Sequence, residues 1–132
     1  IKAVPDAYKL SLCSFYNYFI EILKREKEQM YDTGIINMNE ALMRIENSAL
    51  SYIPDFKEQC TKWYEEDLQI WKSVVENAIS SGEIRSQLDS ISISYLYEDC
   101  YLGRAFEGVF TERGYDIDRL KQTYDYIYAL LK

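Results

Sequence analysis

Helix-breaking residues are scarce in this chain, and their positions constrain its fold more than any other feature. The 132 residues include only five glycines and two prolines. These residues fall between apolar stretches of helical period, instead of cutting the chain into the short segments typical of β-proteins. The sequence therefore predicts an all-α protein, with one domain spanning residues 1–132.

Apolar residues at spacings of three and four indicate where the helices lie. We expect the first from near Asp6 to about Tyr31, a shorter one over 39–50, and a long one from beyond Pro54 to about Ser80. A fourth should run from Asp89 or Ser90 to about Thr111, and a last one should begin near Asp116. The long helix either spans the domain or kinks once. Together these segments predict a helical bundle of about five to six helices.

The last two helices differ in their apolar surfaces. The penultimate helix carries apolar or small residues on more than one side, so it can face its own core and a partner at once. The last helix has a narrow seam at steps of three and four: Ile117, Leu120, Tyr124, Ile127 and Leu131. Such a seam suits packing against one neighbouring helix. A bundle across a twofold axis requires this combination.

The charge of the chain limits its partners. Acidic residues outnumber basic ones by 22 to 15, which gives a net charge of −7. Such a surface would repel a phosphate backbone, so we expect these residues not to bind nucleic acid. No apolar run approaches the roughly 20 residues needed to cross a bilayer, and no signal-peptide order is present. We therefore expect no membrane partner and a cytoplasmic location. The three cysteines are expected to be reduced core residues.

A series of features follows in a defined order from residue 71 onward. Residues 71–110 read WKSVVENAISSGEIRSQLDSISISYLYEDCYLGRAFEGVF. They include a helix ending in Gly82, a Gly-x-Ile-Arg turn, an acidic cap at Asp89 and a helix with Gly103 in its middle; a closing helix with an aliphatic end follows. In order and spacing, residues 71–132 resemble the C-terminal half of TetR-family transcription regulators. The earlier part fits that family as a pattern of helices.

The resemblance implies a homodimer in which the last two long helices of each subunit form a four-helix bundle. We assign the dimer interface to Leu96, Gly103, Phe110, Leu120, Tyr124, Ile127 and Leu131. The resemblance also implies an effector pocket enclosed by the earlier helices. The basic helix-turn-helix that precedes this domain in the family is not among these residues. DNA binding is therefore attributed to an N-terminal domain outside them.

Aromatic residues are dense, with 13 tyrosines, five phenylalanines and two tryptophans. Tyrosine and tryptophan give a binding pocket a flat apolar wall together with a hydrogen-bonding group. The candidates for an effector pocket are Tyr16, Phe19, Trp63, Tyr64, Trp71, Tyr101 and Phe106. Glu107 is a candidate pocket acid, or a partner for Arg104 within the dimer interface. Each aromatic residue could instead pack in the core without binding anything.

Acidic residues beside these aromatics allow a more specific hypothesis. If a carboxylate from residues 65–67 or 98–99 points inward beside an aromatic wall, a cationic effector would be held by both charge and ring faces. The competing interpretation is that these carboxylates form a solvated face.

Enzymatic function is not expected, because the chain has no histidine to act as general base or to complete the Glu-x-x-His pairs of di-iron bundles. It also lacks a glycine-rich phosphate loop, and we expect neither a cofactor nor a metal. We interpret it as the ligand-sensing and dimerisation domain of a TetR-like bacterial regulator, in the family's usual sense a repressor, that binds a small aromatic or amphipathic effector. The alternatives are a helical adaptor that grips a protein partner and a histidine-free enzyme with several buried carboxylates in one cleft.

Overall fold

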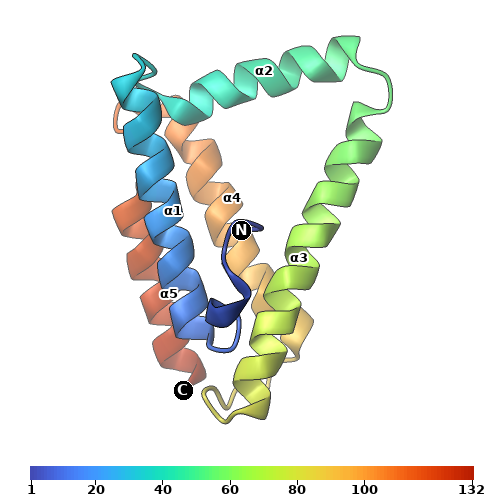
Figure 1. Ribbon diagram of the computed structural model, residues 1–132, viewed down its shortest axis with the longest axis vertical. Coiled ribbons are helices and arrows are strands. Elements are labelled where there is room, and N and C mark those ends of the chain that lie inside the picture. Colours follow the sequence, from blue (N-terminus) through green and yellow to red (C-terminus); the bar gives the residue numbers. More distant parts are fainter.

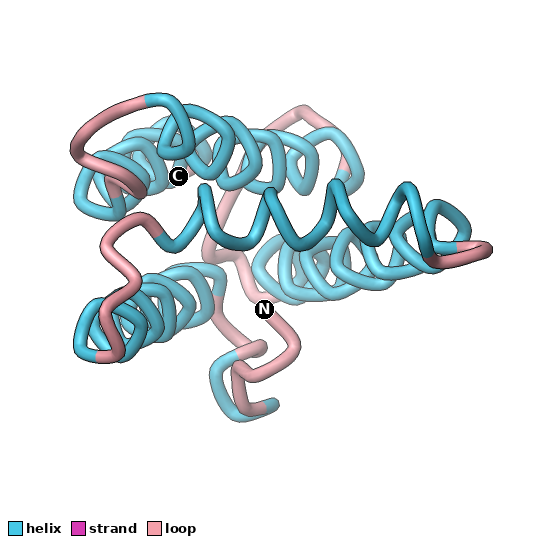
Figure 2. The backbone as a smooth tube through the Cα atoms, turned by 90° about the horizontal axis from the view of Figure 1, so that it is seen from above, coloured by secondary structure: helices cyan, strands magenta, loops and turns pink.

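The computed structural model describes all residues 1–132 and contains five α-helices, one short 3-10 helix and no strands. The elements are η1 (Asp6–Tyr8), α1 (Leu12–Asp32), α2 (Met38–Tyr52), α3 (Phe56–Ser80), α4 (Ser90–Phe110) and α5 (Ile117–Leu131). In Figure 1, α1 and α5 lie together, while α3 leans away from them toward the top. Helix α2 crosses from this group to the upper end of α3, and Figure 2 shows the same arrangement from above. The all-α prediction is confirmed.

Side chains that precede the helices explain where most of them begin. Ser11, Asn37, Asp89 and Asp116 each accept a hydrogen bond from the backbone amide three residues further on. Such caps satisfy amides that the first helical turn leaves free. The helix starts predicted at Asp89 and near Asp116 agree with the structure. The first α-helix begins at Leu12, and not near Asp6, because η1 and a turn occupy the intervening residues.

An aromatic core fills the end of the molecule where α3, α4 and α5 meet. Trp71 stacks on Tyr97 with ring centroids 5.0 Å apart, and Tyr97 lies 4.9 Å from Tyr124. The Tyr124 hydroxyl donates to the carbonyl oxygen of Tyr97 at 3.0 Å. Tyr16 reaches the same cluster from α1 and donates to Asp125 at 2.8 Å. All four rings are buried, so this end is closely packed.

Glu83, in the link between α3 and α4, ties three parts of the chain together. Its carboxylate accepts from the backbone amides of Leu12 and Cys13 at the start of α1 and from the Tyr128 hydroxyl of α5. Partial burial acts to raise the pKa of Glu83, but the hydrogen bonds from Cys13, Leu12, Tyr128 and Ser11 outweigh it and hold the pKa below its usual value. The carboxylate therefore joins the core end of the molecule as an anion.

The first turn of α2 is fastened to the last turns of α4. The side-chain amide of Asn37 donates to the Gly108 carbonyl at 2.8 Å, and that of Asn39 donates to the Ala105 carbonyl at 3.0 Å. The Gly108 carbonyl lies in the last turn of α4, where partners within the helix run out. A Cβ atom at Gly108 would lie 2.8 Å from the Asn39 amide, so the glycine permits this close approach.

The residues assigned to a dimer interface fall into two groups. Leu120, Tyr124 and Leu131 are buried within the subunit, because α5 uses this face against α1 and α4. They are not available to a partner, and Ile127 is half-buried against the same core. Leu96, Gly103 and Phe110 lie on the exposed side of α4. None of the helices has both the length and the apolar character that a membrane span requires.

Candidate functional site

A cavity of about 1270 Å³ lies between α1, α2, α3 and α4 at the end opposite the aromatic core. Most of its lining side chains are apolar, and the N-terminal residues 1–3 border it as well. Its volume exceeds the range of roughly 300–1,000 Å³ that is usual for small-molecule sites. The cavity therefore has room for a drug-sized molecule.

The span of α2 keeps the walls of the cavity apart. This helix of 15 residues is about 22 Å long at 1.5 Å per residue. The chain then reverses at Pro54 and Asp55, where Asp55 takes a left-handed backbone conformation with φ of 64°. The first half of α3 consequently starts far from α4 and contributes no buried side chain, whereas Trp71 and Val74 in its second half are completely buried.

Aromatic side chains from α3 and α4 form much of the cavity wall. Phe56, Trp63 and Tyr64 come from α3, and Phe56 meets Trp63 edge to face with centroids 6.2 Å apart. Tyr101 faces them from α4, and the Tyr115 hydroxyl donates to the Tyr101 carbonyl at 3.4 Å. Trp63 and Tyr64 are about half exposed, unlike the buried rings of the core, so parts of their faces remain accessible.

The roof of the cavity is lined by flexible apolar side chains. Met38, Leu42 and Met43 of α2 and Met30 of α1 border it. Unbranched methionine side chains adapt to ligands of different shapes. The roof can therefore adjust to its contents without a change in backbone position.

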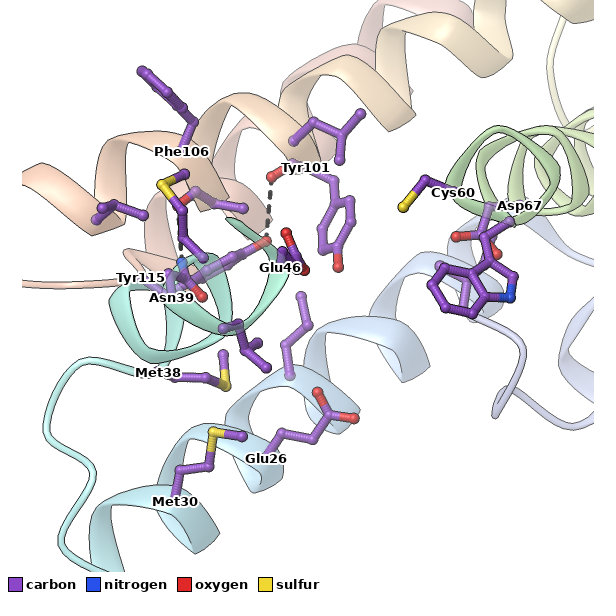
Figure 3. A pocket seen from close by; sticks show the side chains of 18 of the residues that line it. Glu26, Met30, Met38, Asn39, Glu46, Cys60, Asp67, Tyr101, Phe106 and Tyr115 are labelled. Carbon is purple, nitrogen blue, oxygen red and sulfur yellow. Dashed lines mark hydrogen bonds between the residues drawn. The ribbon is translucent and has the colours of Figure 1, made fainter. Parts of the chain in front are cut away.

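Three carboxylates reach the cavity from three helices. Glu26 belongs to α1, Glu46 to α2 and Asp67 to α3; Figure 3 shows them around the ring of Tyr101. Lys2 is the one basic side chain in the lining, and it forms an ion pair with Glu66. Burial raises the pKa of Asp67 above its usual value. The site is therefore apolar, aromatic and acidic.

Glu98 lies just beyond the cavity lining, one helical turn before Tyr101 and Leu102. Its Oε2 accepts a hydrogen bond of 2.9 Å from the indole nitrogen of Trp71. Burial, followed by the charge of Asp67, raises the pKa of Glu98 to about 7, although the bond from Trp71 acts in the opposite direction. The side chain is thus poised between its charged and neutral forms near neutral pH.

The residues predicted to bind a ligand are distributed over three places. Trp63, Tyr64, Tyr101 and Phe106 border the cavity. Tyr16, Phe19 and Trp71 lie in the closed core, where they pack against one another and against Tyr97 and Tyr124. Glu107 is not in the lining; it pairs with Arg104 at 2.7 Å and lies 3.9 Å from Arg113.

Sequence reasoning missed several lining residues. Glu26 belongs to a charged run, residues 24–28, that predicts a solvated helix end, and Glu46 has no aromatic residue beside it in the sequence. The methionines carry no local signal that separates a pocket from a core. Of the carboxylates in residues 65–67 and 98–99 that the sequence allowed to point inward, Asp67 lines the cavity and Glu98 is buried just beyond it.

Comparisons with protein-family models, with curated proteins and with solved structures gave no match. No group of three or more histidine, cysteine, aspartate or glutamate side chains is arranged to hold a metal ion. The site must therefore be interpreted from its own geometry.

Proposed function

We propose that the chain is the effector-binding and dimerisation domain of a TetR-like transcription regulator, acting as a repressor through a DNA-binding domain outside these residues. The observation that carries this proposal is the cavity itself. A space of about 1270 Å³ with an aromatic wall and an adaptable roof suits a small aromatic or amphipathic molecule.

The outer faces of α4 and α5 support a homodimer. Large apolar side chains remain exposed on these two helices, namely Tyr95, Leu96, Phe106, Phe110, Tyr126 and Leu130. Gly103 lies among those of α4, and a Cβ atom there would meet nothing within 4 Å. A glycine within a helix costs stability, and nothing in the subunit requires one at this position. Close approach of α4 from a second copy of the chain would explain why a glycine stands at position 103.

The proposed signal is a change in the arrangement of α2 and α3. Both helices border the cavity, and α3 continues into the core, where it packs against α4. A ligand that binds better to one separation of these helices shifts the population toward it. Through α4 and the dimer, this shift would change the spacing of two DNA-binding domains and hence operator affinity.

The binding part of the proposal can be tested with N-phenyl-1-naphthylamine, a neutral dye that fluoresces in apolar surroundings. We expect saturable binding of one dye per subunit, weakened about fivefold or more by Trp63→Ala or Tyr64→Ala. Tyr31→Ala, at an exposed position outside the cavity, should leave the affinity unchanged. Absence of saturable binding, or equal binding by all variants, would reject the cavity as an effector site.

The dimer part is tested by sedimentation equilibrium. Phe110→Glu should yield monomers, because it places a charge on the proposed apolar contact. Tyr52→Glu, on an equally accessible position of α2, should remain dimeric. A wild-type chain that is monomeric at high concentration would refute this part of the proposal.

Regulation requires a third measurement. Joined to a helix-turn-helix domain that binds its operator only as a dimer, the chain should confer repression that a cavity ligand alters. Repression that is insensitive to every ligand bound in the cavity would contradict a sensory role.

The alternative of a protein-binding adaptor draws on a different surface. Ile45, Tyr52 and Ile53 are exposed at and after the far part of α2, more than half of each side chain being accessible. A partner helix could cover them. In that case Ile45→Glu would abolish partner capture, while dye binding in the cavity would be absent.

A further inference from the structure

Each of the four helices around the cavity places a carboxylate in or next to it. Glu26, Glu46 and Asp67 line the space from α1, α2 and α3, and Glu98 of α4 lies beside Asp67, whose charge raises the pKa of Glu98. These residues are far apart in the sequence, so no single amphipathic helix surface accounts for them. The arrangement concentrates negative potential in one low-dielectric space.

Positive groups balance this charge only in part. The α-amino group of Ile1 borders the cavity and is attracted by Asp67, Glu26 and Glu98. Lys2 borders the cavity, but its ammonium group forms an ion pair with Glu66, which does not line the cavity. The ion pairs elsewhere on α4 involve Arg104 with Glu107, also away from the lining. The carboxylates still outnumber the positive groups, and a cation that enters the cavity would reduce the cost of this excess negative charge.

Glu98 provides a second and independent observation. The residue is 5% exposed, and its Oε1 atom is buried without any hydrogen-bond partner. Trp71 occupies only the other oxygen, Oε2. Buried polar atoms are nearly always satisfied, so this free oxygen, just beyond the cavity lining, indicates a missing donor or positive group.

Aromatic faces lie next to these carboxylates. Asp67 is one turn beyond Trp63 and Tyr64 on α3, and Tyr101 is one turn beyond Glu98 on α4. A positive centre near the face of an aromatic ring is attracted by the ring electrons, most strongly when it is removed from water. Carboxylates and rings together therefore favour organic cations with large apolar groups over small hydrated ions.

We propose that the ligand of the cavity is a lipophilic organic cation, with its positive centre beside Asp67 and Glu98 and its apolar groups against Trp63, Tyr64 and Tyr101. This inference rests on the proposed function, because it specifies the ligand class of the same cavity. A neutral molecule would gain only the apolar contacts, and an anion would be repelled by the carboxylates of the lining.

Tetraphenylphosphonium and tetraphenylborate test the proposal, because they share one shape and carry opposite charges. Calorimetric titrations of the full chain at pH 8 keep Glu98 mostly ionised, since the pKa of Glu98 is about 7. The cation should bind with at least about tenfold higher affinity than the anion. Equal affinities, or tighter binding of tetraphenylborate, would overturn the proposal.

A charge-removing variant locates the effect. Asp67→Asn should weaken tetraphenylphosphonium binding about fivefold to tenfold and leave binding of the neutral dye unchanged. Asp118→Asn removes the same charge from an exposed position of α5 and serves as the matched control. Unchanged cation affinity in Asp67→Asn would contradict the assigned position.

The neutral dye separates this failure from failure of the proposed function. Dye binding without a preference for the cation would leave the effector cavity standing and reject only the ligand class. Absence of binding by the dye and by both ions would reject the cavity together with the ligand class.

Discussion

The two ends of this molecule use the same kinds of side chain for different purposes. At the core end, Trp71, Tyr97 and Tyr124 lie with centroids 4.9–5.8 Å apart and are completely buried. At the opposite end, which holds the cavity and is called the open end below, Trp63 is 46% exposed. Its ring is paired with that of Phe56 alone. Both tryptophans belong to α3. The comparison teaches that aromatic content marks neither a core nor a binding site by itself.

The tightness of helix packing distinguishes the two ends. Around Trp71, helices α1, α4 and α5 supply rings from several directions. Around Trp63, α2, which is hydrogen-bonded to the end of α4, holds the first half of α3 at a distance from α4. Apolar surface at the core end is removed from water by the chain itself, whereas at the open end much of it stays exposed.

The largest contrast is expected between the two tryptophans. Trp71→Ala should lower the free energy of unfolding by about 3–5 kcal/mol, because it leaves a large void and removes the donor to Glu98. Trp63→Ala should cost less than about 1 kcal/mol, because the ring is half exposed. Urea unfolding measures both values. Similar losses in the two variants would show that the ends are equally packed.

Protonation of Glu98, which lies between the two ends, should make the free energy of unfolding depend on pH. Burial and Asp67 raise its folded pKa to about 7 from the usual 4.5, while Asp99 adds to the rise and the amino group of Ile1 and the Trp71 bond oppose it. Between these values the folded chain binds more protons than the unfolded chain. The free energy of unfolding should therefore fall as pH rises from about 4.5 to 7, by on the order of 3 kcal/mol.

Glu98→Gln should remove this component, since an amide oxygen can still accept from Trp71 and does not titrate. Thermal unfolding between pH 4.5 and 8 compares the variant with the wild type. Glu112→Gln, at an exposed position just after α4, is the control. An identical decline in Glu98→Gln would assign the pH dependence to other groups, such as Asp67, whose pKa is also raised.

Gly108→Ala should loosen the open end where it is fastened. The new methyl group would meet the Asn39 amide at 2.8 Å and the backbone of Gly114 at 2.9 Å. We expect a loss of about 1–3 kcal/mol from overpacking. Hydrogen exchange should show faster opening of α2 than of the core helices. A uniform change over all helices would argue against a separate fastening of α2.

Gly103→Ala should have the smallest effect on the subunit, and in the opposite direction. A methyl group fits into open space here, so the free energy of unfolding of the monomer should rise by about 0.5–1 kcal/mol. Under the proposed dimer, the same methyl group should weaken association in sedimentation experiments. A variant that is stabilised and associates as the wild type does would place the dimer contact elsewhere.

The sequence by itself determined the helical character of the protein and most of the helix limits. Helical period, caps such as Asp89 and Asp116, and the scarcity of glycine and proline act over a few residues, so they can be recognised without knowledge of the fold. It also predicted that Trp63, Trp71, Tyr101 and Phe106 either line a pocket or pack in the core, because period identifies a face.

Only the tertiary structure decided which of these helix faces is buried in the core and which remains accessible at the cavity. Trp63 and Trp71 lie a little over two turns apart on one broad apolar side of α3, yet one borders a cavity and the other lies in the core. The apolar seam of α5 is likewise buried within the subunit, as Leu120 and Tyr124 show. Period defines a direction around a helix, whereas burial depends on the distance to the next helix. That distance is fixed by contacts between remote residues, such as Asn39 with Ala105.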